Sequence, residues 1–291
     1  MASLSLKKAI QGLLRRLGIY QRVKSSCLYD LYWKIADPKL IQDRSRELEF
    51  YRTTLQGLRR GDVVFDIGAN VGQKTDIFLR LGTRVVAVDP DESNQAVLRQ
   101  RFLTYRLRAK PVVVVGQAIS DKNGTETMWL DEPGSAKNTL NSKWVDTLKT
   151  DSTRFGKALD FAEQRKVETI TLTELMQRHG SPFYVKIDVE GHEPAVLRGL
   201  DRPVPYVSFE VNLPEFRAEA LQCIESLQRL ASAGEFNYAA DCRRGLALGQ
   251  WLPMEAFCKV VNACQEACIE VFWRTPAAGR TVQGMNSPAP H

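Results

Sequence analysis

An apolar stretch that runs directly into a glycine-rich turn constrains this chain more than any other sequence feature. Residues 63–67 (VVFDI) have the character of a short buried strand, and the turn after them follows the pattern D-x-G-x-x-x-G with Gly68 and Gly72. A helical pattern begins immediately after the turn. Glycine permits the sharp turn and the close packing of helix on strand that such a connection requires. The feature predicts the first strand–helix unit of a parallel sheet.

Strand-like and helix-like segments then alternate along much of the chain. Short apolar runs predict strands at 63–67, 84–88, 112–115, 167–171, 183–187, 206–211, 236–239 and 269–273. Helical periodicity predicts helices at 39–58, 75–81, 93–107, 173–179, 194–200, 215–233 and 254–267. This alternation is typical of parallel strands joined by crossover helices. We therefore expect an α/β fold.

The segment between residues 116 and 156 breaks this regularity. Residues 116–130 have the character of strand pieces around a turn at 121–124. Residues 131–156 are polar, contain glycine and proline, and show no clear period. A long irregular segment inside a compact domain is usually functional or mobile. We interpret it either as a lid or substrate loop or as a surface insertion.

The two ends of the chain differ from its body. Residues 1–60 carry 13 Lys or Arg and 5 Asp or Glu, so their net charge is +8, whereas the whole chain carries +6. Apolar residues at helical spacing predict a basic amphipathic helix at 6–24, which either docks on the body or rests on an anionic membrane surface. We expect a helical extension at 1–44, one domain at 45–274 and a disordered tail at 275–291.

Composition and spacing argue against several classes of protein. No apolar run is long enough to span a membrane, and no signal peptide is evident, so we expect a cytoplasmic protein with at most peripheral membrane contact through residues 6–24. The six cysteines form no C-x-x-C pair and the three histidines are scattered, so no zinc site is predicted. Because the excess basic charge belongs to the extension, we expect no nucleic-acid partner.

The glycine turn has an acidic partner. Asp89 lies 21 residues after Gly68, at the end of the second predicted strand, where a carboxylate can bind both hydroxyls of a ribose. Asn70 stands where a dinucleotide-binding turn would need glycine. Asp66 adds a negative charge that would repel a pyrophosphate but suits an ammonium group. Together these residues favour S-adenosylmethionine over a dinucleotide.

A second acidic cluster follows the strand at 183–187. The sequence KIDVEGHE at 186–193 brings Asp188 and His192 to the carboxyl end of that strand, and Glu210 ends the next one. Ligands of open parallel sheets bind at this edge. His192 is a candidate base at neutral pH, with Asp188 orienting it or accepting the proton itself. Alternatively, the histidine is structural, and acids at 190 and 193 only favour a helix start. Nothing in the spacing requires a metal.

At these residues the sequence resembles the FkbM-type methyltransferases. The resemblance covers roughly residues 45–274. It rests on FDIGANVGQKTDIFLRLG (65–82), VVAVDPD (85–91), QAISDKNGT (117–125), TLTELMQRHG (171–180), YVKIDVEGHEPAVLRGL (184–200), FEVN (209–212) and VFWR (271–274). The resemblance implies a Rossmann-like methyltransferase fold with a seven-stranded sheet and helices on both faces.

The resemblance also implies site residues. Residues implied to line the cofactor are Asp66, Gly68, Ala69, Asn70 and Gly72, with Asp89 at its ribose, Gln117 and Ala118 at its adenine, and Asp188 where cofactor and acceptor meet. Many relatives have Glu at the position of Asp89, so the carboxylate is kept but its reach is shorter.

The expected activity is S-adenosylmethionine-dependent methylation, mostly of a hydroxyl on a sugar, glycan or secondary metabolite. Asp188, His192 and Glu210 are the expected catalytic residues. Two alternatives stay open: a nicotinamide-dependent oxidoreductase, against which Asn70 argues, and a non-catalytic binding protein that retains the fold.

Overall fold

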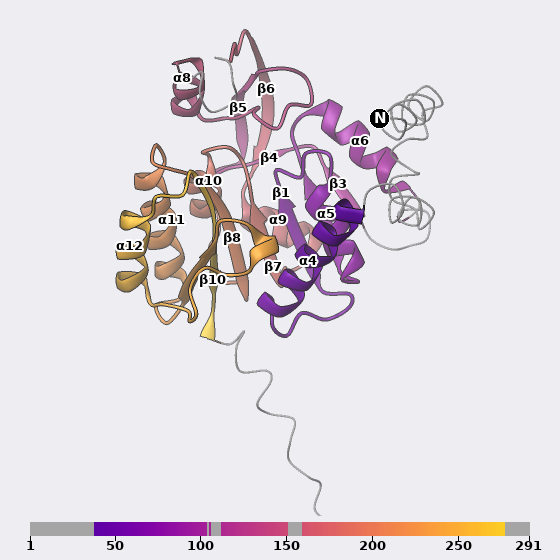
Figure 1. Cartoon of the computed structure of the whole chain (residues 1–291). Coiled ribbons are helices and arrows are strands. Elements are labelled where there is room, and N and C mark those ends of the chain that lie inside the picture. The colour runs from indigo at the N-terminus through magenta and orange to yellow at the C-terminus, as the bar shows by residue number, and fades with distance from the viewer. Residues whose placement is uncertain (1–37, 104, 106–111, 151–158, 277–291) are drawn as a thin grey trace, which may run out of the picture.

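The structure is a computed structural model that describes residues 38–103, 105, 112–150 and 159–276 (Figure 1). Its centre is a seven-stranded sheet in the order β3-β2-β1-β7-β8-β10-β9. The strands are β1 (Val63–Ile67), β2 (Arg84–Val88), β3 (Val112–Val115), β7 (Tyr184–Ile187), β8 (Tyr206–Asn212), β9 (Glu235–Ala239) and β10 (Cys268–Arg274). The first five pair in parallel, and β10 runs antiparallel to β8 and β9. The expected Rossmann-like fold with a mostly parallel sheet is confirmed.

Helices cover both faces of this sheet (Figure 1). One face packs on α4 (Pro38–Thr54), α5 (Gln73–Arg80) and α6 (Glu92–Arg101) through buried residues such as Tyr51, Phe78 and Leu98. The other face packs on α9 (Leu172–His179), α10 (Glu193–Arg198), α11 (Arg217–Leu230) and α12 (Met254–Ala263). Alternate residues of each strand enter the two cores, because successive side chains point to opposite faces.

A second, three-stranded sheet stands above the carboxyl ends of the parallel strands (Figure 1). It consists of β4 (Ala118–Ile119), β6 (Glu163–Ile170) and β5 (Gly124–Leu130). The helix α8 (Ser142–Thr150) accompanies it and buries Trp144, Val145 and Leu148. The expectation of an irregular segment at 131–156 is therefore wrong over α8. Its apolar face comprises only three residues, which is too few for a clear period.

The chain ends lie largely beyond the described residues. The amphipathic helix expected at 6–24 and the tail from 277 onward fall outside them. The helix α4 crosses the expected boundary at residue 45, and its Phe50 and Tyr51, with Leu55 directly after it, are buried in the core. Within the ranges described here, no helix is long and apolar enough to cross a membrane.

Candidate functional site

The glycine turn is fixed by contacts between strands. Gly68 has φ +81°, and a Cβ on it would overlap the backbone carbonyl oxygen of Asp188 on the neighbouring strand connection. A left-handed backbone conformation with no room for a side chain admits only glycine. The amide groups of Gly68 and Ala69 both donate to Val88 O at 2.9 Å. The turn thus brings the ends of β1, β2 and β7 together.

The amide groups of this turn are used within the protein. Asn70 N donates to the Asp89 carboxylate at 2.8 Å, Val71 N to the Asn70 side chain at 2.6 Å, and Gly72 N to Ala69 O at 2.8 Å. Gly72 is required by packing and not by contact with a ligand. A Cβ at this position would lie 2.5 Å from the ring of Phe102, which follows α6. The amide groups of residues 68–72 therefore all have acceptors within the protein.

A narrow cavity of about 60 Å³ lies at the carboxyl ends of β1, β2 and β7. Its polar lining residues are Asn70, Asp89, Asp91, Asn94, Ser135, Asn138, Asp188, Glu190 and His192, and its apolar ones include Ile67, Ala118, Ile119, Met128 and Leu140, with Gly68 at the turn. Of the predicted cofactor residues, Gly68, Asn70, Asp89, Ala118 and Asp188 line it. Ala69 and Gly72 support the turn behind it.

The Asp89 carboxylate is held in place by protein donors. It accepts hydrogen bonds from Asp91 N at 2.9 Å, Asn70 N at 2.8 Å and the Asn94 side chain at 3.3 Å. Burial raises the pKa of Asp89 to about 6. The carboxylate is ionised at neutral pH, lines the narrow cavity and has further lone pairs for hydroxyl donors.

Two predicted cofactor residues point elsewhere. Asp66 is 1% exposed and accepts a hydrogen bond from Thr75 of α5 at 2.5 Å, so its carboxylate lies beneath a helix and does not line the cavity. Burial raises the pKa of Asp66. The Gln117 side chain is exposed, donates to Glu168 and accepts from Arg178 in a separate surface hollow. Side chains alternate along extended backbone, so Ala118 faces inward while Gln117 faces outward.

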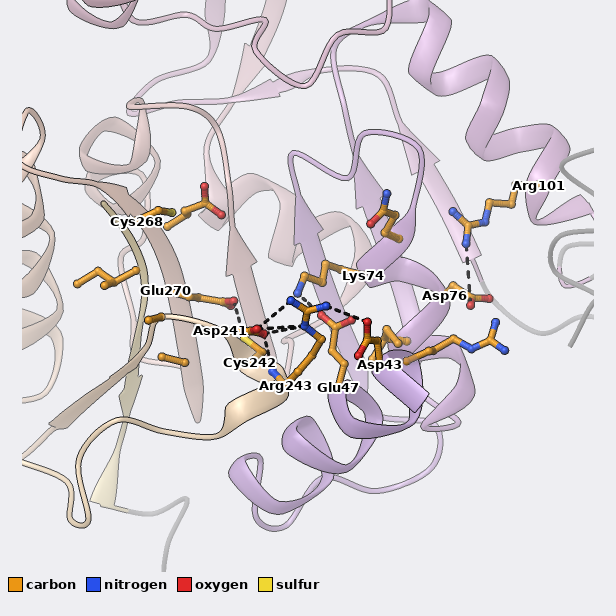
Figure 2. Close-up of a pocket in the computed structure, with 17 residues that line it drawn as sticks. Asp43, Glu47, Lys74, Asp76, Arg101, Asp241, Cys242, Arg243, Cys268 and Glu270 are labelled. Atoms are coloured by element: carbon orange, nitrogen blue, oxygen red, sulfur yellow. Dashed lines mark hydrogen bonds and ion pairs between the residues drawn. The ribbon is translucent and has the colours of Figure 1, made fainter. Parts of the chain in front are cut away.

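A second, wide cavity of about 600 Å³ opens beside the narrow one, between α4, α5 and the ends of β8, β9 and β10 (Figure 2). Its charged lining residues are Asp43, Arg44, Glu47, Lys74, Asp76, Arg101, Glu210, Asp241, Arg243 and Glu270. Arg243 bridges Asp241 at 2.8 Å and Asp43 at 3.1 Å across the cavity wall, and Lys74 pairs with Glu47. The few apolar residues there include Ile77 and Ile269. The lining suits a polar, hydroxyl-bearing ligand.

A row of carboxylates joins the two cavities. Glu210 of β8 is paired in register with Glu270 of β10, and Asp188 lies one step beyond the last β7–β8 pair, Ile187 with Phe209. Asp188 lines the narrow cavity, whereas Glu210 and Glu270 line the wide one. The negative charge of Asp188, together with burial, raises the pKa of Glu210 to about 7. A carboxylate with this pKa can accept a proton near neutral pH.

Lys186 anchors this row from inside the sheet. It is 2% exposed, and its Nζ donates to Asp188 Oδ2 at 2.8 Å. This ion pair fixes the orientation of the Asp188 carboxylate.

The half-buried Glu270 was not anticipated from the sequence. Its carboxylate accepts hydrogen bonds from Ser208 at 2.6 Å, Cys242 at 3.1 Å and Tyr184 at 3.4 Å. Burial alone would raise the pKa of Glu270, but the nearby ammonium groups of Lys186 and Lys74 hold it below the usual value. The one signal for it is an acid inside the apolar strand CIEVFWR.

His192 does not line the wide cavity, so it is not placed to act as a base there. Its Nε2 lies 3.1 Å from Ser120 Oγ and 3.7 Å from Glu126 Oε2, and it lines only the narrow cavity. Burial lowers the pKa of His192. The Glu193 carboxylate accepts from Val189 N and Gly191 N, so it stabilises the turn before α10. Glu210, and not His192, lines the wide cavity.

The sequence matches a known protein family over more than half of its length. The model described as the methyltransferase FkbM domain matches residues 66–234. This range includes the glycine turn, Asp89, the Asp188 cluster and Glu210. No curated protein matches the chain.

Several solved structures are similar to the chain. A methyltransferase FkbM from Methylobacillus flagellatus is 12% identical with a TM-score of 0.48, and the alignment covers 78% of this chain and 47% of that one. A precorrin-6y C5,15-methyltransferase from Geobacter metallireducens is 11% identical with a TM-score of 0.38, covering 79% and 86%. A SAM-dependent O-methyltransferase from Thermotoga maritima is 10% identical with a TM-score of 0.40, covering 79% and 64%. The chain thus spans less than half the length of the M. flagellatus protein.

Proposed function

Because the chain belongs to the FkbM methyltransferase family, we propose that it transfers a methyl group from S-adenosylmethionine to a hydroxyl of a sugar, glycan or secondary metabolite. The narrow cavity is the proposed cofactor site, and the wide cavity is the proposed acceptor site. One observation carries the proposal: Asp188 lines the narrow cavity, and Glu210, whose pKa the charge of Asp188 raises, lines the wide one.

The residues of the narrow cavity fit the nucleoside part of the cofactor. Asp89 offers a fixed carboxylate for ribose hydroxyls, and Ala118, Met128 and Leu140 offer apolar surface for a base. The Asp188 carboxylate places negative charge where a cation is favoured. When bound, the cofactor supplies an electrophilic methyl group on a positively charged sulfur.

The acceptor hydroxyl is activated by the carboxylate row in this mechanism. Glu210 takes the hydroxyl proton while the oxygen forms its bond to the methyl carbon and the carbon–sulfur bond breaks, which leaves S-adenosylhomocysteine. The charge of Asp188, whose carboxylate is held by Lys186, raises the proton affinity of Glu210. Fixing the hydroxyl against the methyl group supplies much of the rate.

Two measurements test this proposal: calorimetry tests cofactor binding first, and a turnover assay then tests methyl transfer. The purified full chain should bind S-adenosylhomocysteine, and no binding would refute cofactor use. Extracts of cells with and without the gene should then differ in a metabolite or surface glycan by the mass of one CH₂ group. The purified protein should add a labelled methyl group to that compound as isolated from the cells without the gene. Binding without any turnover would instead support the non-catalytic alternative.

Cofactor binding is expected to weaken as the pH falls. Since the pKa of Asp89 is about 6, each pH unit below this value should lower the affinity for S-adenosylhomocysteine up to about tenfold, because the protonated carboxyl is a poorer acceptor for two hydroxyls. Calorimetric titrations across the range from about pH 5 to pH 8 measure this. The Asp89→Asn protein should bind weakly at every pH. An affinity of the unmodified protein that does not change with pH would contradict the assignment.

A further inference from the structure

The irregular segment at 131–141 forms part of the wall of the narrow cavity. Ser135, Ala136, Asn138 and Leu140 line this cavity together with Gly68 and Asp188 of the strand ends. The segment also pairs with β5, since Trp129 and Thr139 exchange two backbone hydrogen bonds of 2.8 and 3.1 Å. It therefore leaves the small sheet, crosses the cavity and leads into α8.

Asp91 attaches this segment to the strand that carries the proposed ribose carboxylate. Its Oδ2 accepts hydrogen bonds from Gly134 N at 2.7 Å and from the Asn138 side chain at 2.8 Å. Its Oδ1 caps α6 by accepting from Ser93 N at 2.8 Å. Asp91 is 1% exposed, and its own amide donates to Asp89 at 2.9 Å. One buried carboxylate thus links the segment, α6 and the end of β2.

A second attachment holds the segment to the opposite rim. The Thr139 hydroxyl donates to Glu190 O at 2.8 Å, and the Asn141 side chain donates to Gly191 O. Both acceptors belong to the turn that follows Asp188. Glu190 has φ +54°, a left-handed conformation that is uncommon for a residue with a side chain. The segment is fastened on the β2 side by Asp91 and on the β7 side by this turn.

The volume beneath the segment shows that it is closed. The narrow cavity measures about 60 Å³, whereas sites for drug-sized ligands and cofactors measure about 300 Å³ or more. The other walls are strand ends, the start of α6 and the turns at 68–70 and 188–192. The segment is attached chiefly by hydrogen bonds, four with side-chain partners and two between its backbone and that of Trp129, so it is the wall that we take to move. Leu140 packs on the small cluster around Met128, and no residue of the segment belongs to the two main core clusters.

We propose that residues 131–141 are a lid on the cofactor site and that Asp91 is the positioning residue that latches the lid. The inference rests on the proposed function, since it takes the narrow cavity as the site of S-adenosylmethionine. The lid opens to admit the cofactor and is fastened again by its two hydrogen bonds to Asp91 once the cofactor lies beneath it, in a site wider than the cavity of about 60 Å³ in this structure. Asn138, which lines the cavity and reaches Asp91, joins the cofactor to the latch.

Weakening the latch should shorten the residence time of the bound ligand. In Asp91→Asn, the amide can still cap α6, but its NH₂ group faces the donors Gly134 N and Asn138 Nδ2. Asn138→Ala removes one of the two latch bonds and leaves the α6 cap intact. Each variant should release S-adenosylhomocysteine about tenfold faster than the unmodified protein, as loss of a hydrogen bond to a charged group implies. Stopped-flow measurement of the dissociation rate provides the readout.

Limited proteolysis provides an independent readout of the lid. Trypsin cleaves after Lys137 only when the segment opens, so S-adenosylhomocysteine should slow cleavage there in the unmodified protein. Asp91→Asn should be cleaved faster and protected less. Thr171→Ala is the matched control: it removes the cap of α9, where Thr171 accepts from Glu174 N at 3.0 Å, without contacting the lid. The control should match the unmodified protein in both assays.

The outcomes separate the lid from the proposed function. If the unmodified protein binds no S-adenosylhomocysteine, the proposed function is wrong, and the proposal of a lid is then wrong as well. If the unmodified protein binds the ligand but Asp91→Asn and Asn138→Ala release it at the unmodified rate, the lid is overturned and the proposed function stands. Equal acceleration in Thr171→Ala would also overturn the lid, because the effect would then follow from general loss of stability.

Discussion

The Glu210→Gln protein is expected to transfer methyl groups about 100-fold or more slowly than the unmodified protein, while binding S-adenosylhomocysteine with the same affinity. A general base contributes about 10²–10⁴-fold to such a rate, and Gln retains the shape of Glu without its proton affinity. Glu210 lines the wide cavity, not the narrow one, so the cofactor site should be unaffected. Single-turnover rates with the acceptor found by metabolite comparison measure the loss.

The pH profile distinguishes a base from a structural residue. Because the pKa of Glu210 is about 7, the rate of the unmodified protein should rise through about pH 7 and level off above it, and this rise should disappear in Glu210→Gln. The raised pKa also means that ionised Glu210 destabilises the fold as the pH rises through about 7. The variant should therefore melt no lower than the unmodified protein at pH 8.

A matched control and a contradicting result complete this test. Glu225→Gln changes an exposed glutamate of α11 and should alter neither rate nor pH profile. If Glu210→Gln keeps at least half of the unmodified rate, Glu210 is not the base. Asp188 would then be the next carboxylate to test, since it lies beside Glu210 and lines the cofactor cavity.

The second large effect is expected from a single methyl group at the glycine turn. Gly68→Ala should lower the free energy of unfolding by about 3 kcal/mol or more and reduce the affinity for S-adenosylhomocysteine at least about 100-fold. The new Cβ would overlap the backbone oxygen of Asp188, which cannot turn aside as a flexible side chain could. The ends of β1 and β7 would have to separate, and with them Asp89 and Asp188 on the two sides of the cofactor site.

Gly180→Ala is the control for the cost of the backbone conformation alone, without a steric overlap. Gly180 has φ +91°, close to the φ of +81° at Gly68, but a Cβ there would meet no atom within 4 Å. With ψ 165° as well, Gly180 lies in a region that costs a residue with a side chain about 1–3 kcal/mol, so Gly180→Ala should lose stability by this conformational cost alone and leave ligand binding unchanged. Thermal melting and calorimetry of both variants measure the difference. A Gly68→Ala protein that is no less stable than Gly180→Ala, or that binds normally, would contradict the argument.

The local patterns predicted the architecture well. Strand–helix alternation and the glycine spacing predicted the parallel sheet, and the structure confirms strands within a few residues of the predicted ranges for β1, β2, β3, β7 and β8. These signals are legible because each depends on residues close together in the chain. The short helix α8 was missed because its apolar face has only Trp144, Val145 and Leu148.

The sequence predicted where the candidate site lies, but not which side chains point into it. Asp89, Asp188 and Glu210 lie at the carboxyl ends of the parallel strands β2, β7 and β8, so this edge of the sheet was predictable from the strand ends alone. The surroundings of Asp66 were not, because its burial depends on how Thr75 of α5 lies over β1. The side chain of Gln117 points outward because of how the chain enters the two-residue strand β4, Ala118–Ile119. A strand this short shows no alternation in the sequence from which that direction could be predicted.

By itself the sequence determined the fold class, the edge of the sheet where the chemistry lies, and three of its carboxylates, because strand periodicity and the D-x-G-x-x-x-G turn are local properties of the chain. Only the tertiary structure decided which groups meet there. Glu270 reaches Glu210 through an antiparallel pairing across 60 residues of sequence, and Asp91 reaches Asn138 across 47. Register between distant strands and the path of a loop are set by packing of the whole core, so no local pattern encodes them.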